Sequence, residues 1–180
     1  MSLSLRHAEP EDALPIARVH VHSWQVAYRG LLSESYLAQM RVEERAERYD
    51  LANRDPSKPQ TIVAVYRDFV CGFATVSAHC EESACFGELC ALYVDPGYWN
   101  RGVGRALIAA ARERMVGYGI PTAVLWLLKG NARAARFYEL DGWRPDGASR
   151  EATVWGLAVQ EVRYRRILQD SISPQPGPGK

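Results

Sequence analysis

The stretch that decides the fold is residues 88–108, ELCALYVDPGYWNRGVGRALI. Its first seven residues, 88–94, are mostly apolar and predict a strand that ends at the turn residues 95–97, DPG. A helical pattern then extends from about Gly102 to Tyr118. The stretch therefore predicts a strand, a glycine-containing turn and a helix in direct succession.

Gly102 and Gly104 lie where this strand gives way to the helix, and they predict an anion site. Glycine lets backbone amides approach a ligand without obstruction by a Cβ atom, and the amides of a first helical turn attract anions. Arg101 and Arg105 add positive charge beside the turn. The simpler interpretation, that the two glycines only permit close packing of the helix on the strand, stays open. The spacing excludes the GxxxxGK[ST] and GxGxxG phosphate motifs, the second because position 107 is Leu.

The chain before this stretch begins with a predicted strand over residues 3–7 and a helix over about 11–29. The helix is indicated by apolar residues that recur every three or four positions. These residues are Leu14, Ala17, Val21, Trp24 and Tyr28. A short second helix near residues 33–40 and a charge-rich, solvated helical face over 42–53 are expected next.

Between residues 61 and 78 two β-rich runs, TIVAVY and FVCGFATVSA, flank Arg67 and Asp68 and predict a hairpin. A loop is expected over residues 80–87, CEESACFG. It would connect the hairpin to the strand over residues 88–94.

The second half alternates further strands with helices. A strand over residues 124–128 is followed by a helix over 131–140, which Gly142 ends, and then by late β runs near 153–155 and 161–167. Together with the hairpin, this order predicts an α/β (α+β) fold with a mixed central sheet flanked by helices. We expect residues 1–170 to form a single domain, and the Pro- and Gly-rich tail over 171–180 to be disordered.

Composition excludes several classes of protein. The 180 residues are 47% hydrophobic and 24% charged, as in ordinary globular domains, and 22 Lys plus Arg against 21 Asp plus Glu leave a net charge of +1. We expect no nucleic-acid or membrane partner, because no strong charge and no apolar run of membrane-spanning length is present. The amino end does not resemble a secretory signal, which predicts a cytoplasmic location.

The four cysteines indicate neither a metal site nor a disulfide framework. Cys71, Cys80, Cys85 and Cys90 contain no CxxC pair and have no histidines at zinc-ligand spacing. We therefore expect no metal, and reduced thiols throughout.

The stretch over residues 88–108 and the later segment LWLLKGNARAARFYELDGW, residues 125–143, resemble the two signature segments of the GNAT superfamily of N-acetyltransferases. The likeness implies a GNAT-like sheet and acetyl-coenzyme A as cosubstrate, with a bulge in the strand before the cofactor-binding helix. It covers residues 61–143 well. It also implies transfer of the acetyl group to a primary amine, such as a polyamine or a peptide amino terminus, whose identity stays open, as does the choice between monomer and homodimer.

The resemblance assigns the cofactor site residue by residue. In the family motif [QR]xxGx[GA] the two glycine positions fall on Gly102 and Gly104, whereas the first position falls on Trp99 instead of Gln or Arg. The main-chain amides of the turn are implied to surround the pyrophosphate, and the backbone of the bulged strand is implied to pair with the pantetheine arm. The amides belong to Arg101, Gly102, Val103, Gly104 and Arg105, and the strand partners are Leu92 and Val94.

Acetyl transfer needs an acid for the departing thiolate, and Tyr138 is the candidate. It lies seven residues after Asn131, about two helical turns along the same face. The family likeness places the Asn beside the pantetheine arm and the Tyr near the sulfur. A core aromatic and a plain helix cap are the alternative interpretations of the two residues.

The remaining candidate residues concern the acceptor amine. Glu88, at the start of the bulged strand, is the favoured base, an exposed strand-end Glu being the alternative; His20, His22 and Asp95 are weaker rivals. Trp24 and Tyr28 lie one turn apart and are expected to form an aromatic wall for the amine, although core packing explains the same spacing.

Two other functions stay open. One is a non-catalytic acyl-coenzyme A-binding sensor or scaffold with the same fold, which Trp99 makes worth considering, although Tyr138 argues against it. The other, nucleic-acid binding through the short basic clusters, is disfavoured by the near-zero net charge.

Overall fold

The computed structural model describes residues 3–55, 58–81, 84–154 and 156–168. They form a seven-stranded sheet with the order β1-β2-β3-β4-β5-β7-β6. Every neighbouring pair is antiparallel except β4 and β5, which are parallel, so the sheet is mixed as expected. The strands are β1 (Ser4–His7), β2 (Gln60–Tyr66), β3 (Phe69–Glu81), β4 (Ala84–Val94), β5 (Thr122–Leu128), β6 (Arg144–Val154) and β7 (Leu157–Ile167).

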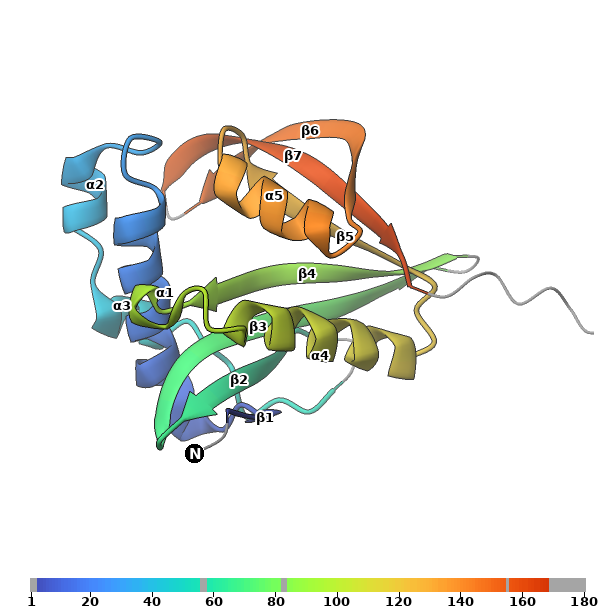
Figure 1. Cartoon of the computed structure of the whole chain (residues 1–180), viewed down its shortest axis with the longest axis horizontal. Helices are drawn as coiled ribbons and strands as arrows, with labels where there is room; N and C mark the ends of the chain where they lie inside the picture. The colour runs from blue at the N-terminus through green and yellow to red at the C-terminus, as the bar shows by residue number, and fades with distance from the viewer. Residues whose placement is uncertain (1–2, 56–57, 82–83, 155, 169–180) are drawn as a thin grey trace, which may run out of the picture.

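Helices cover both faces of the sheet (Figure 1). Alternating residues of β2 show the division, because Ile62 packs with α4 in one hydrophobic cluster and Val63 packs with α1 in another. The helices are α1 (Ala13–Ala27), α2 (Glu34–Ala38), α3 (Val42–Ala46), α4 (Val103–Gly117) and α5 (Ala132–Leu140), with 3₁₀ turns at Pro10–Asp12 and Pro96–Tyr98. The strand, turn and helix predicted from residues 88–108 are thus present.

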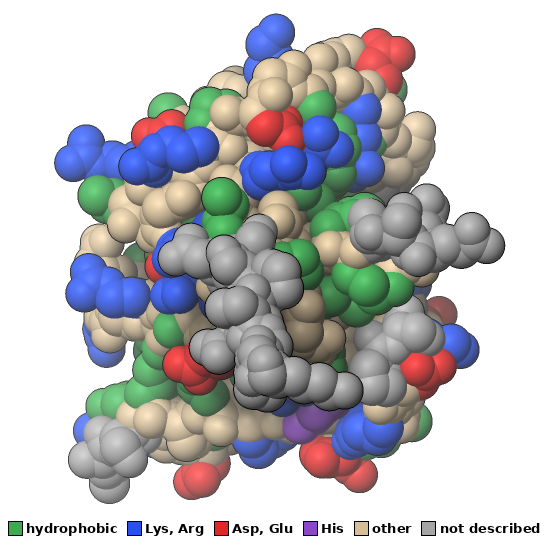
Figure 2. Space-filling model, turned by 90° about the vertical axis from the view of Figure 1, so that its right-hand side faces the viewer, with side chains coloured by type: hydrophobic (Ala, Val, Ile, Leu, Met, Phe, Trp, Pro, Cys, Tyr) green, Lys and Arg blue, Asp and Glu red, His purple; other side chains and the backbone are tan. Residues whose placement is uncertain are grey.

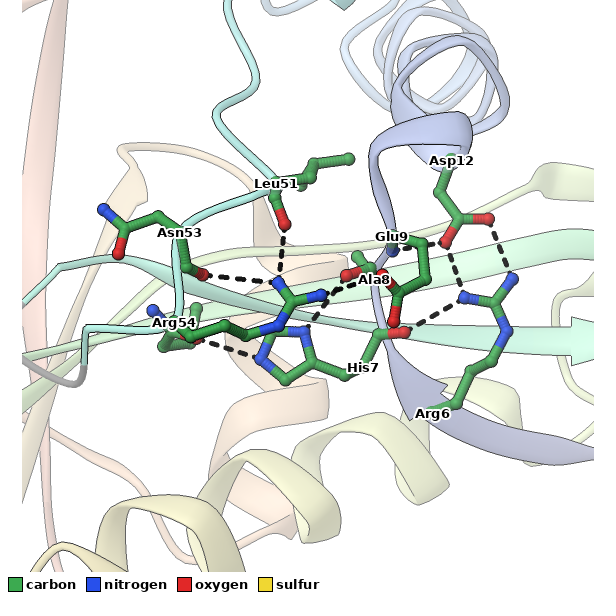
Figure 3. Close-up of polar contacts among 9 residues, drawn as sticks. Arg6, His7, Ala8, Glu9, Asp12, Leu51, Asn53 and Arg54 are labelled. Carbon is green, nitrogen blue, oxygen red and sulfur yellow. Dashed lines mark hydrogen bonds and ion pairs between the residues drawn. The ribbon is translucent and has the colours of Figure 1, made fainter.

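The start of α1 is held by a polar network around the first strand (Figure 3). Arg6 donates two hydrogen bonds to the buried carboxylate of Asp12, at 2.6 and 2.9 Å, and the amide of Glu9 donates a third at 2.8 Å. Arg54 donates to the Glu9 carboxylate at 2.9 Å and to the carbonyl of Leu51 at 2.6 Å. The network joins β1, the first helix and the segment before β2.

The expected loop over residues 80–87 is largely absent, because β3 continues to Glu81 and β4 begins at Ala84. Register places Cys80 directly opposite Cys85, and the two form a disulfide. The expectation of reduced thiols is therefore wrong for this pair, since it relied on the expected cytoplasmic location and took no account of strand pairing. Cys71 and Cys90 are free.

Other boundaries differ in length. The charge-rich face expected over residues 42–53 is helical only over Val42–Ala46, and the late β runs extend to β6 and β7 of 11 residues each. The tail over 171–180 lies outside the described residues. On the face shown in Figure 2, basic and acidic side chains are interspersed and do not form one continuous basic surface.

The sheet opens between β4 and β5. These strands pair only at Gly87 with Ala123 and at Glu88 with Val124, and beyond that point they diverge (Figure 1). The pairing of β4 with β3 skips one residue, because Thr75 faces Ala91 whereas Val76 faces Leu89. The predicted bulge is therefore present, and its extra residue is Cys90.

Candidate active site

A cavity of about 1010 Å³ occupies the region where β4 and β5 diverge. Its walls come from α1, β4, α4, β5, α5, β6 and β7, so residues far apart in the sequence meet there. Ten of the twelve predicted site residues line it. They are Trp24, Tyr28, Leu92, Val94, Gly102, Val103, Gly104, Arg105, Asn131 and Tyr138.

The first turn of α4 presents main-chain amides to this cavity. Gly102 precedes the helix with a φ of 83°, a left-handed conformation that glycine adopts readily. The first bond within the helix is donated by Ala106 to the Gly102 carbonyl at 3.0 Å. The amides of Val103 to Arg105 precede that bond, and Gly102 at the N-cap position has no side chain that could accept from them. The turn therefore has the form of an anion site.

Gly104 also has a packing role. A Cβ atom built there would lie 3.4 Å from the ring of Phe137 on α5. The two interpretations of this glycine are compatible, because the close approach of α5 makes one wall of the cavity.

Trp99 holds the turn in place. Its indole N–H donates a 2.7 Å hydrogen bond to the carbonyl of Val94 at the end of β4. The guanidinium of Arg133 lies 3.3 Å from the centre of the indole ring, and both residues line the cavity. The Trp at the usual Gln or Arg position thus ties the turn to the strand.

The arginines divide into two groups. Arg105, Arg133 and Arg136 line the cavity near the α4 turn and surround it with positive charge. Arg101 instead lies 5.6 Å from the ring centre of Tyr98 and is not among the lining residues. Sequence reasoning did not select Arg133 and Arg136, although both follow Asn131 on the same helix.

The exposed edge of β4 faces the gap. The amide of Asp95 donates to Cys71 on β3, so the alternate residues Leu92 and Val94 direct their peptide groups away from β3. The Val94 carbonyl already accepts hydrogen bonds from Trp99 and, at 2.9 Å, from the hydroxyl of Ser23. The amide N–H of Val94 and the N–H and C=O groups of Leu92 also face the gap, and neither of these two hydrogen bonds uses them.

Tyr138 lies on α5 with 8% of its surface exposed, and it lines the cavity. Burial raises the pKa of its hydroxyl well above the ordinary value, so the group stays protonated at neutral pH. Asn131 caps the same helix, its side-chain oxygen accepting from the Ala134 amide at 3.1 Å. The cap orients the Asn131 side chain at the cavity wall.

The α1 side of the cavity is aromatic. Trp24 and Tyr28 are in edge contact, with ring centres 4.7 Å apart, and burial, followed by Tyr93 on β4, raises the pKa of the Tyr28 hydroxyl. Tyr93 stacks on His20 at 4.4 Å. Burial, followed by the charge of Arg45, lowers the pKa of His20 well below its ordinary value, which keeps the ring neutral. Trp24 and Tyr28 belong to a core cluster, as the packing interpretation predicts, and they also line the cavity.

Three of the four candidate bases lie outside the cavity lining. The Glu88 carboxylate lies 3.2 Å from the ring nitrogen of His79, and His22 lies 2.8 Å from the carboxylate of Asp95. The acidic residue that faces the cavity beside the aromatic wall is Glu161 on β7. It accepts a 2.7 Å hydrogen bond from Arg150, whose guanidinium lies 4.0 Å from the ring centre of Trp126.

Sequence reasoning missed Glu161, Tyr93 and Trp126. Tyr93 lies inside the signature stretch and could have been found from strand alternation, because it shares a face with Ala91. Glu161 carried no usable signal, since its position depends on how β7 pairs with β5 and β6.

The described residues contain no group of three or more His, Cys, Asp or Glu side chains placed to hold a metal ion. Among the same residues, no helix combines the length and apolar character needed to cross a membrane.

Comparison with known proteins places these features in a family. Residues 22–143 match the model of the acetyltransferase (GNAT) family. The chain is 27% identical over 167 residues to the uncharacterized N-acetyltransferase YuaI of Bacillus subtilis, with 89% of this chain and 90% of that protein covered. It is 26% identical over 149 residues to a spermidine N(1)-acetyltransferase of Thermoplasma acidophilum, covering 80% and 89%.

The fold is similar to solved structures of N-acetyltransferases. PaiA N-acetyltransferase from Thermoplasma acidophilum, solved in complex with coenzyme A, superposes with a TM-score of 0.71 at 23% identity, covering 93% of this chain and 99% of that one. With a family model that spans most of the chain, a sheet that opens between β4 and β5, and a glycine turn that presents its amides there, the chain belongs to the GNAT family of acyl-coenzyme A-dependent N-acetyltransferases.

Proposed function

We propose that this enzyme transfers the acetyl group of acetyl-coenzyme A directly to a primary amine. The observation that carries the proposal is one continuous cavity that joins the amides of the α4 turn to the Tyr138 hydroxyl and to the aromatic wall of α1. A direct transfer needs these parts in one space, because the donor thioester and the amine must be in contact.

The cofactor half of the cavity is assigned to α4, α5 and the edge of β4. The amides of Val103, Gly104 and Arg105 suit a diphosphate, and the guanidinium groups that line this half would balance its charge. The free edge of β4 at Leu92 and Val94 suits an extended arm that carries amide groups. Asn131 would contact that arm from the start of α5.

Tyr138 is assigned the role of acid. Its raised pKa keeps the hydroxyl protonated, so it can donate a proton to the thiolate as the C–S bond breaks. This placement favours turnover over the sensor or scaffold alternative, since binding alone requires no proton donor in the gap.

The acceptor half is assigned to Trp24, Tyr28, Tyr93 and Glu161. Aromatic faces and a carboxylate suit an amine that arrives as a cation. The likeness to a spermidine N(1)-acetyltransferase makes polyamines the first class to test, and peptide amino termini the second.

Release of free thiol from acetyl-coenzyme A should be measured over polyamines, amino acids, aminoglycosides and short peptides, with calorimetry of acetyl-coenzyme A alone beside it. Turnover with one amine class and a binding signal are the expected results. Binding without turnover by any amine would favour the sensor alternative, and no binding would overturn both.

A further inference from the structure

Four polar side chains on β3 and β4 form a connected chain that starts at the cavity. The Cys90 sulfur lies 3.2 Å from the Ser77 hydroxyl oxygen, which lies 2.9 Å from Nε2 of His79. The same ring nitrogen lies 3.2 Å from the Glu88 carboxylate. These contacts thus link Glu88, which does not line the cavity, to Cys90, which does.

Strand geometry explains why these side chains meet. Ser77 and His79 are two positions apart on β3 and share a face, and Glu88 is the register partner of Ser77 on β4. Cys90 is two positions after Glu88 and shares its face, so its sulfur lies near Ser77, and it also lines the cavity.

Both ends of this hydrogen-bonded chain are exposed and its middle is buried. Cys90 is exposed at the cavity wall, Ser77 is buried at 7% exposure, and the His79 side chain is 45% exposed. Phe86 stacks on the His79 ring at 5.0 Å and Glu88 holds its nitrogen, so the ring is fixed at the surface. A proton could therefore pass along these side chains from the cavity to the surface at His79.

We propose that Cys90, Ser77 and His79 form a relay that carries a proton from the acceptor amine to solvent, with Glu88 as the positioning residue for His79. The inference rests on the proposed function, because it requires an ammonium group to bind beside Cys90. In this relay Glu88 acts through His79 and does not contact the amine itself.

The protons balance as follows. The ammonium gives one proton to the Cys90 sulfur while the thiol proton passes to the Ser77 oxygen, the Ser77 proton passes to Nε2 of His79, and the imidazolium releases a proton to solvent. The neutral amine then forms the N–C bond as the C–S bond breaks. The thiolate takes the Tyr138 proton, and the surplus proton on the new amide nitrogen returns to Tyr138.

Cys90 suits a relay better than a nucleophile. Desolvation at the cavity wall raises the pKa of its thiol above the ordinary value, with the hydrogen bond shared with Ser77 acting in the opposite direction. Besides Cys90, the titratable members of this group of four side chains are Glu88 and His79. The sulfur is thus a protonated thiol at neutral pH, and it can donate one proton as it accepts another.

The kinetic test compares Ser77→Ala, which interrupts the chain at its buried link, with Ser77→Thr, which keeps the hydroxyl. At pH 7 we expect kcat of the Ala variant to fall by at least about tenfold, with KM for acetyl-coenzyme A unchanged, and the Thr variant to retain most activity. The deficit should close as the pH approaches the pKa of the amine in solution, where the substrate arrives neutral. An equal deficit at every pH, or none, would overturn the relay.

A second arm needs neither cosubstrate. Carbamidomethylation of Cys90 by iodoacetamide at pH 8 is followed by mass spectrometry in the wild type, Ser77→Ala and Ser77→Thr proteins, with buried Cys71 as the internal control. We expect the Ala variant to react several-fold more slowly than the wild type and the Thr variant, because it loses the hydrogen bond by which Ser77 lowers the thiol pKa. Equal rates in these three proteins would count against the link between Cys90 and Ser77. If the rate of Cys90 alkylation depends on Ser77 in a protein that acetylates no amine, only the proposed function is overturned.

Discussion

The indole N–H of Trp99 donates a 2.7 Å hydrogen bond to the carbonyl of Val94, which connects the end of β4 to the turn before α4. The same carbonyl accepts from Ser23 on α1. One carbonyl group therefore joins β4, the turn before α4 and helix α1.

Trp99→Phe keeps an aromatic ring beneath Arg133 but removes the donor to Val94. Loss of one hydrogen bond costs about 1 kcal/mol, so we expect acetyl-coenzyme A to bind roughly fivefold more weakly. Trp99→Gln, which keeps a donor, is the matched control and should bind more tightly than the Phe variant. Calorimetry would contradict this role of the indole if the Phe variant bound like the wild type.

Tyr138→Phe removes the proposed acid with little change in volume. We expect turnover to fall by at least about tenfold, with little change in acetyl-coenzyme A affinity. Because burial raises the Tyr138 pKa, the acid stays protonated through the neutral range, and a loss of wild-type activity near pH 8 would have another origin. Equal thiol release by the two proteins would remove Tyr138 from this role.

Arg105→Ala and Arg101→Ala test the electrostatics of the turn with a matched pair. Arg105 lines the cavity whereas Arg101 lies against Tyr98, so only the first should weaken acetyl-coenzyme A binding, by roughly fivefold at low salt. The difference should shrink at high ionic strength, because salt screens exposed charges. Equal losses in both variants would contradict the assignment.

Asp12→Asn tests the network at the start of α1. Burial alone would raise the pKa of Asp12, but hydrogen bonds from Arg6 and from the Glu9 amide outweigh it and lower the value. A lowered pKa stabilises the fold above the unfolded value near 4 and loses that contribution as pH falls through the folded value.

We therefore expect Asp12→Asn to reduce the free energy of unfolding by about 1–3 kcal/mol at pH 7. At a pH below the lowered pKa of Asp12 the two proteins should converge, because the wild-type carboxylate is then largely protonated. Urea unfolding at both pH values measures the difference. A deficit that does not depend on pH would show that packing, and not the charge of Asp12, is responsible.

Local patterns were sufficient for much of this protein. The apolar run of residues 88–94, the glycines at 102 and 104 and the periodicity of residues 103–117 predicted the strand, turn and helix, because each depends on neighbours a few positions away. The seven-residue spacing of Asn131 and Tyr138 likewise predicted two residues of one helix, and both line the cavity.

What only the tertiary structure decided depends on strand pairing. The register of β3 with β4 joins Cys80 to Cys85 and places Glu88 against His79, and the bulge falls at Cys90, which lines the cavity. The pairing of β7 with β6 brings Glu161 to the wall of the cavity. A shift of one residue would reverse the face of every side chain in such a strand, and no local sequence pattern specifies that choice.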